Sequence, residues 1–205
     1  RSGDDGQRKF SAENFRGESE NVLRSYKIIA NIPYNITGAI LKKFLTAEQQ
    51  PEMMVLMVQH EVATRILARD GKESILSISV KAYGEPKMIA KVDKRYFSPA
   101  PKVNSAIIAI KNISRKNFNS PLEEYPLGGG GNASTPSRVR ATPQEGNLET
   151  RFWEIVKKGF AHKRKKLSGN LKDVCQRDTL TSYADKRAED LTLADWIYLA
   201  KAHRV

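Results

Sequence analysis

One stretch, residues 27–35 with the sequence Lys-Ile-Ile-Ala-Asn-Ile-Pro-Tyr-Asn, constrains the fold more than any other. The apolar run that opens it predicts a buried strand of a parallel sheet. Pro33 cannot donate a backbone hydrogen bond and pushes Ile32 into an extended conformation, so we expect the strand to end in a stiff polar loop. Thr37 is then expected to cap a helix over residues 37–47. A strand, a rigid loop and a helix in this order are typical of the ligand-binding edge of an open α/β sheet.

The chain up to residue 116 alternates strand-like apolar runs with helical patterns. This alternation predicts the α/β class, and the run of strands at its end predicts an antiparallel edge to the sheet. A second helix is expected at 60–68, where apolar residues recur at helical spacing. The further strands are expected at 53–58, 75–83, 86–93 and 106–110.

The segment 117–150 has a different composition from what precedes it. It contains four consecutive glycines at 128–131, four prolines and few apolar residues, which predicts a flexible linker or long loop. Helical patterns return after it, with short helices expected at 180–184 and 191–200 and Thr192 as an N-cap. The expected parts are therefore an α/β part at 1–116, the linker at 117–150 and a helical part at 151–205.

Composition and charge narrow the class of function. The 35 basic and 23 acidic side chains give a net charge of +12 and a pI of about 9.8, which favours nucleic acid as the partner. Cys175 is the sole cysteine, so no disulfide framework is possible and a reducing cytoplasm is expected. We expect no membrane association, because no apolar run approaches the roughly 20 residues of a membrane span. No metal site is expected either, because the sequence shows no His/Cys spacing typical of one.

Four further blocks follow the Asn-Ile-Pro-Tyr loop in a fixed order, at 59–65, 97–106, 159–167 and 187–191. Together the five blocks resemble the family of small-subunit ribosomal RNA adenine N6,N6-dimethyltransferases. The resemblance implies the C-terminal part of a Rossmann-like class I methyltransferase sheet, followed by a small all-helical domain. It also implies S-adenosyl-L-methionine as the methyl donor, dimethylation of two adjacent adenines, and the small ribosomal subunit as the partner of a monomeric enzyme.

The chemistry of adenine methylation assigns roles to the loop. An exocyclic amine shares its lone pair with the ring, so it must be held with its hydrogens bound and its lone pair aimed at the methyl group. The side-chain carbonyl of Asn31 and the backbone carbonyl of Ile32 are expected to accept those two hydrogens, with Pro33 keeping the loop stiff. Tyr34 is expected to stack on one face of the adenine, and Phe97 to close the other face.

The resemblance places methyl-donor contacts at Asn31 and at Asn14. Asn14 lies 17 residues before Asn31, where the family has an acidic residue that contacts the adenine of S-adenosylmethionine. An amide there can form a hydrogen bond but carries no charge. No Gly-x-Gly turn follows an apolar strand, so we expect a fragment that lacks the cofactor-binding front, binds S-adenosylmethionine weakly or not at all, and leaves its sheet with an unprotected edge.

A basic block in the C-terminal part predicts contacts to RNA phosphates. Residues 151–205 carry 13 basic and 7 acidic side chains, and the basic ones cluster on a helix that also has an apolar stripe. Neutralised phosphates would supply affinity and positioning without reading sequence. The predicted RNA-binding residues are Lys157, Lys158, Lys163, Arg164, Lys165 and Lys166.

Two alternatives stay open beside the dimethyltransferase. A non-catalytic ribosome-assembly factor could keep the RNA surface while lacking the Gly-rich front. A large-subunit ribosomal RNA adenine methyltransferase of the macrolide-resistance type shares the loop, although the 97–105 block and the basic helix argue against it. Methylation of small against large ribosomal subunits would separate these readings.

Overall fold

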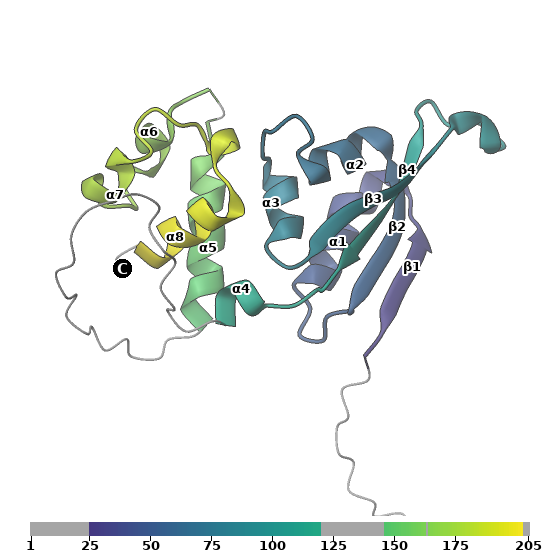
Figure 1. The fold of residues 1–205 in the computed structure, drawn as a ribbon, viewed down its shortest axis with the longest axis horizontal. Coiled ribbons are helices and arrows are strands. Elements are labelled where there is room, and N and C mark those ends of the chain that lie inside the picture. Colours follow the sequence, from purple (N-terminus) through teal and green to yellow (C-terminus); the bar gives the residue numbers. More distant parts are fainter. Residues whose placement is uncertain (1–24, 120–145, 163, 203–205) are drawn as a thin grey trace, which may run out of the picture.

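The computed structural model describes residues 25–119, 146–162 and 164–202. Its centre is a four-stranded sheet in the order β1-β2-β4-β3 (Figure 1). The two central strands are rich in Met, Val and Ile and are largely buried, which is the pattern of strands covered by other elements. The strands are β1 (Lys27–Asn31), β2 (Met53–Gln59), β3 (Glu85–Val92) and β4 (Ser105–Lys111).

The pairing makes the sheet mixed. β1 runs parallel to β2, while β4 is antiparallel to both β2 and β3. In the register of the sheet, Ser105 at the start of β4 faces Gln59 at the end of β2 and Val92 at the end of β3. The end of β1, the end of β2 and the start of β4 therefore lie at the same end of the sheet. The antiparallel outer strand expected from the sequence is present as β3.

Three helices cover one face of the sheet, α1 (Thr37–Leu45), α2 (His60–Leu67) and α3 (Ile75–Lys81). Their buried side chains meet the alternate strand residues that point to the same face. These contributions to the core include Leu41, Leu45, Ile66 and Ile78 from the helices and Met54, Leu56, Val58, Ile108 and Ile110 from the strands.

The other face of the sheet is less covered by the described residues. Ile29 on this face is 79% exposed, and its neighbours Val55, Met57 and Ile107 are only half-buried. Within the described chain, β1 lies at the edge of the sheet. The prediction of a buried first strand is therefore wrong among the described residues, because β1 alternates exposed and half-buried side chains and no described strand pairs with its outer side.

The C-terminal helices form a second layer beside the first three (Figure 1). The long helix α5 (Gly146–Gly159) packs against α8 (Leu193–Ala202), with Trp196 fully buried between them. Thr192 accepts a hydrogen bond from the backbone N–H of Asp195, so the predicted N-cap is confirmed. The remaining short elements are α4 (Lys116–Asn119), α6 (Leu167–Leu171), α7 (Arg177–Thr181) and η3 (Ala188–Asp190).

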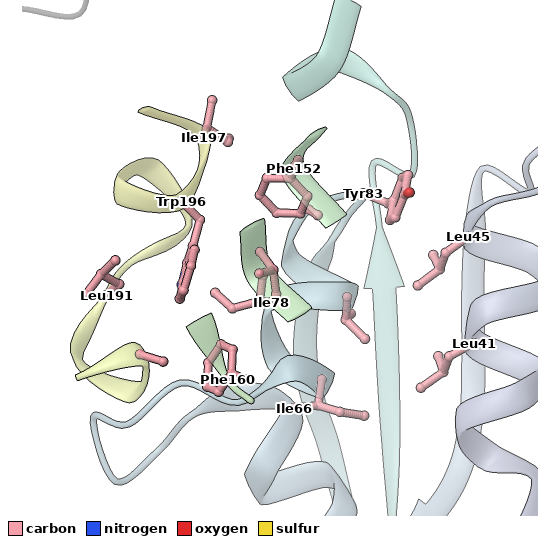
Figure 2. Packing of buried hydrophobic residues seen from close by; sticks show 14 of the residues in the cluster. Leu41, Leu45, Ile66, Ile78, Tyr83, Phe152, Phe160, Leu191, Trp196 and Ile197 are labelled. Atoms are coloured by element: carbon pink, nitrogen blue, oxygen red, sulfur yellow. The ribbon is translucent and has the colours of Figure 1, made fainter. Parts of the chain in front are cut away.

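The sheet unit and the helical unit share one continuous core. Figure 2 shows buried side chains running from Trp196 of α8 through Phe152 of α5 and Tyr83 to Leu45 of α1. Tyr83, in the turn after α3, is 1% exposed and donates a hydrogen bond to Glu149, while Trp153 donates one of 3.0 Å to the Tyr83 hydroxyl. Burial, and after it the hydrogen bond to Glu149, raise the pKa of Tyr83, while the hydrogen bond from Trp153 acts in the opposite direction.

Arg115 completes this joint between the two units. Its guanidinium donates to Glu149 Oε2 at 3.1 Å and to the carbonyls of Thr46 and Ala47 at 2.8 and 3.0 Å. Those carbonyls follow α1, where a helix leaves acceptors without intrahelical partners. A single side chain thus links the end of α1 to the start of α5.

The strand predicted over 75–83 is wrong, because this segment forms α3. Its apolar residues alternate, but a short apolar run is ambiguous between strand and helix. Ser74 decides the local outcome, since its hydroxyl accepts from the Ser77 N–H while the Ser77 hydroxyl accepts from the Ser74 N–H. Packing against α2 then buries Ile78 and Val80.

Smaller differences concern the ends of elements. The Thr37 hydroxyl does not accept a capping bond; it donates to the carbonyl of Tyr34 at 3.1 Å, and α1 ends at Leu45 rather than at 47. The linker predicted at 117–150 overlaps α4 and α5 at its two ends. None of the helices that the structure describes has the length and apolar character needed to cross a bilayer.

Candidate active site

The loop after β1 is held by its own backbone. The carbonyl of Pro33 accepts from the N–H of Ile36 at 3.2 Å, and the carbonyl of Tyr34 accepts from both the N–H and the hydroxyl of Thr37. These bonds form the short 3₁₀ turn η1 (Tyr34–Ile36), which leads directly into α1. The prediction of a stiff loop between strand and helix is therefore confirmed.

A long-range hydrogen bond fixes the tyrosine of the loop. The hydroxyl of Tyr34 and the hydroxyl of Ser105 share a bond of 2.6 Å across 71 residues of sequence. Ser105 is fully buried at the start of β4. Because β2 lies between β1 and β4, the Tyr34 side chain reaches across the end of β2 to make this bond.

Asn31 is presented differently from the rest of the loop. It is the last residue of β1 and is exposed, whereas the next residue, Ile32, is 6% exposed and anchors the loop in the core. Within the described chain the Asn31 amide has no hydrogen-bond partner. Asn31, paired in β1 and followed by a buried residue, thus carries a free side-chain amide. This amide can accept hydrogen bonds from a ligand and donate them to it.

The segment between β3 and β4 reaches the same edge of the sheet. Asn104 ties it down, because its backbone carbonyl accepts from the N–H of His60 at 2.9 Å and its side-chain carbonyl accepts from the N–H of Lys94 at 3.0 Å. Phe97 lies on this segment and is half-buried. No hydrogen bond or ring contact among the described residues joins Phe97 to Tyr34, so the structure brings the two to one edge but not into contact.

A pocket of about 320 Å³ lies beside this edge. Its lining includes His60 at the start of α2 and the side chains of Lys94, Lys102 and Asn104. The cationic side chains give this end of the sheet a positive lining, although Glu61 also contributes to the wall. The pocket adjoins the residues that position the loop rather than the Asn31 amide itself.

The basic block spans a helix and the loop that follows it. Lys157 and Lys158, at the end of α5, line a cleft of about 1660 Å³ between the helical unit and the sheet unit. Arg164, Lys165 and Lys166 lie in the loop before α6 and are exposed. Lys166 is bound to Asp185 at 2.6 Å and Lys158 approaches Glu154 at 3.7 Å, while Lys163 lies outside the described residues.

The described residues supply only part of a methyl-donor site. Asn31 is exposed at the carboxyl end of β1, the end at which open α/β sheets bind ligands, but Asn14 lies outside the described residues. No described strand flanks β1 on its outer side. The described residues therefore fit the methyl-accepting side of a site and do not by themselves enclose a methyl donor.

Two residues that set the geometry were not singled out from the sequence. Ser105 and Asn104 both fall in the block at 97–106, yet no role could be assigned to them without their partners. Their one local signal is position, since two small polar residues immediately precede a strand of Ala and Ile. The partners, Tyr34, His60 and Lys94, come from three other elements.

The fold and the loop define a class. A mixed sheet with an antiparallel last pair, an Asn-Ile-Pro-Tyr loop at the end of a parallel strand, and a helical unit after it fit the class I methyltransferase fold with an added helical domain. Comparison with known proteins specifies the class further. The family model described as ribosomal RNA adenine dimethylase matches residues 8–125, more than half of the chain.

Relatives and solved structures agree with that match. A protein of Dehalococcoides mccartyi named ribosomal RNA small subunit methyltransferase A is 32% identical over 92% of this chain and 63% of its own length. A protein of the same name from Nostoc punctiforme is 36% identical over 88% of this chain and 58% of its own length. The chain thus spans less than two thirds of these relatives. It belongs to the ribosomal RNA adenine dimethylase family.

Two solved structures share the fold. A dimethyladenosine transferase from Plasmodium falciparum aligns with a TM-score of 0.64, at 21% identity over 88% of this chain and 69% of that one. The 23S rRNA methyltransferase ErmE aligns with a TM-score of 0.61, at 21% identity over 87% of this chain and 65% of that one. At these identities the likeness concerns the fold alone, which confirms the predicted class.

Proposed function

We propose that this chain forms the adenine-binding side of the catalytic unit, together with the C-terminal helical unit, of an S-adenosylmethionine-dependent enzyme that dimethylates adjacent adenines of small-subunit ribosomal RNA. The observation that carries the proposal is the exposed Asn31 amide at the end of β1, followed by the buried Ile32 and by Tyr34, whose hydroxyl is bonded to Ser105. Family membership and the names of the relatives support the substrate class.

The loop fits the demands of an aromatic amine. We infer that the Asn31 side-chain carbonyl and the Ile32 backbone carbonyl each accept one N–H of the adenine amine, which directs the nitrogen lone pair away from the ring plane. The amine gains positive charge as it reacts, two carbonyl dipoles stabilise that charge, and the methylated nitrogen then loses a proton to water. Pro33 limits the movement of both acceptors. S-adenosylmethionine, when bound, supplies the methyl group.

Tyr34 and Phe97 are proposed to hold the base itself. An adenine withdrawn from its stack loses stacking energy, and aromatic side chains can replace it at about 1–3 kcal/mol per base. Tyr34 is half-buried and tethered through its hydroxyl, so its ring offers a fixed face. Phe97 lies on the segment between β3 and β4, and we propose that this segment approaches the base from the other side.

The positive charge of the chain suits a folded RNA. We propose that Lys157 and Lys158 contact phosphates from within the cleft, and that Arg164 and Lys165, with Lys163, contact them from the loop before α6. Lys166 contributes less, because Asp185 already neutralises it at 2.6 Å. The small ribosomal subunit is then the partner, and a cytoplasmic site of action follows from that partner.

The test adds the segment of the Dehalococcoides mccartyi relative that this chain does not match. The chain joined to that segment, called the restored enzyme below, would be assayed for transfer of labelled methyl groups to unmethylated small and large ribosomal subunits. We expect transfer to small subunits, and a loss of about 100-fold or more in kcat for Asn31→Ala, the usual effect of removing one group that stabilises transition-state charge.

Asn35→Ala is the matched control. Asn35 is an exposed asparagine of the same loop, four residues further on, and its replacement should leave kcat within a few-fold of the parent. Equal losses in the two variants would contradict the role given to Asn31. Transfer to large subunits alone would support the macrolide-resistance reading, and RNA binding without any transfer would support a non-catalytic assembly factor.

A further inference from the structure

The aromatic ring proposed to receive the adenine has its outer end fixed by a residue from a distant strand. The Tyr34 and Ser105 hydroxyls share a bond of 2.6 Å, and Ser105 is 0% exposed. A tyrosine held only by its backbone can rotate about two side-chain torsions. A bond at the far end of the ring fixes both torsions, so the angle of the ring face is set by the position of the serine.

Ser105 itself is held by the sheet. It pairs with Gln59 of β2 on one side and with Val92 of β3 on the other. Its neighbour Asn104 adds hydrogen bonds to the first residue of α2 and to the start of the segment that carries Phe97. The sheet therefore holds the Ser105 hydroxyl at a fixed position. The orientation of the Tyr34 ring then depends on the sheet rather than on its own loop.

We infer that Ser105 is a positioning residue for adenine methylation, which acts through the Tyr34 hydroxyl to hold the ring at the angle that the target base requires. This inference rests on the proposed function for its catalytic consequence, but the coupling between the two residues is independent of it. Ser105 has no contact with the base in this scheme, because the phenol ring lies between them.

The first arm of the test measures the coupling in the chain as it stands. Incorporation of 3-fluorotyrosine gives one fluorine NMR signal set for each of the seven tyrosines, and Tyr34→Phe identifies the signal of interest. Ser105→Ala should shift and narrow the Tyr34 signal, because the ring gains motion, and should leave the other tyrosine signals in place. An unchanged Tyr34 signal in Ser105→Ala overturns the inference.

Ser77→Ala is the matched control for a merely structural effect. Ser77 is also a fully buried serine with hydrogen-bonded hydroxyl, but it lies in the capping box of α3. Its replacement is expected to lower stability without moving the Tyr34 signal. A Tyr34 signal that changes equally in both serine variants would mean general loosening of the fold and would also overturn the inference.

The second arm measures turnover in the restored enzyme. Ser105→Ala and Tyr34→Phe are each expected to lower kcat by about 10-fold, the rate equivalent of one lost hydrogen bond, with KM for RNA little changed. The double variant should be no slower than either single one, because both remove the same bond. Additive losses, or parent-like turnover in Ser105→Ala while Asn31→Ala is inactive, would overturn the positioning role of Ser105 and leave the proposed function intact. If the parent transferred no methyl groups, the proposed function would be refuted instead, and the fluorine signals would still decide whether Ser105 and Tyr34 are coupled.

Discussion

Gly159 offers the most direct test of the packing in the helical unit. It is the last residue of α5, and a Cβ placed there would lie 2.3 Å from Cη2 and 2.8 Å from Cζ3 of Trp196. Carbon atoms in ordinary contact are about 3.5–4.0 Å apart. Trp196 is fully buried and its ring stacks on Phe160 at 5.5 Å, so the indole has no free direction in which to move.

The expected effect of Gly159→Ala is a loss of stability. Overpacking of a well-packed core costs about 1–3 kcal/mol, and the higher helix propensity of alanine returns up to about 1 kcal/mol. The 2.3 Å approach places the overpacking cost in the upper part of that range, so the net loss is about 1–2 kcal/mol, which corresponds to a Tm lower by about 2–8 °C for a chain of this size. Urea unfolding followed by far-ultraviolet circular dichroism measures the difference directly.

Gly169→Ala is the matched control, because no heavy atom lies within 4 Å of the Cβ that it would add. Within α6 this change should leave stability unchanged or raise it by up to about 1 kcal/mol. The reasoning is refuted if Gly159→Ala is as stable as the parent, since the close approach of the indole would then impose no requirement for glycine at the start of the 159–167 block.

Three other predictions follow from single contacts. Burial and the nearby Asp195 carboxylate raise the pKa of Tyr183 from 10.0 to about 12. Because the unfolded chain releases this proton at lower pH than the folded chain, the free energy of unfolding should fall as the pH rises from 10 to 12. Urea titrations at each pH should show a smaller fall for Tyr183→Phe. Arg115→Met should lower the unfolding free energy by about 1.5–3 kcal/mol, because Glu149 loses a charged hydrogen bond in a half-buried joint. Arg65→Met breaks an exposed pair with Glu61 and should change the unfolding free energy by less than about 1 kcal/mol. Equal losses in the two variants would contradict the effect assigned to burial. In the restored enzyme, Lys157→Ala should reduce the slope of log affinity for RNA against log salt by about 0.7–0.9. Lys166→Ala should reduce it by less, because Lys166 is paired with Asp185. A filter-binding titration that gave the reverse order would contradict this effect of the pair.

The joint around Tyr83 bears on how the two units act together. Glu149 of α5 meets both Tyr83 and Arg115, and Arg115 in turn meets the carbonyls at the end of α1. The helix that follows the Asn-Ile-Pro-Tyr loop is thereby connected to the first helix of the helical unit. A common core between them, rather than a mobile hinge, fixes the cleft in which Lys157 and Lys158 lie.

The sequence predicted the class of fold, and it singled out the loop of the candidate site, because both depend on local features. A β-rich apolar run, a proline that restricts its neighbour, and apolar residues at helical spacing each act within a few residues. The strands β2, β3 and β4, the helices α1 and α2, and the stripe of α5 followed from such patterns. Where two local outcomes were close in energy, as in the alternating run of α3, the sequence pattern alone favoured the wrong one.

The contacts that complete the site could be found only in the folded chain. The bond from Tyr34 to Ser105 joins residues 71 positions apart, and nothing in either segment specifies the other. The separation of Lys157 and Lys158 from Arg164 has the same origin, since α5 ends between them and the chain turns. The sequence by itself determined which residues can take part in adenine chemistry; the tertiary structure decided their relative orientation, because orientation depends on which distant elements pack together.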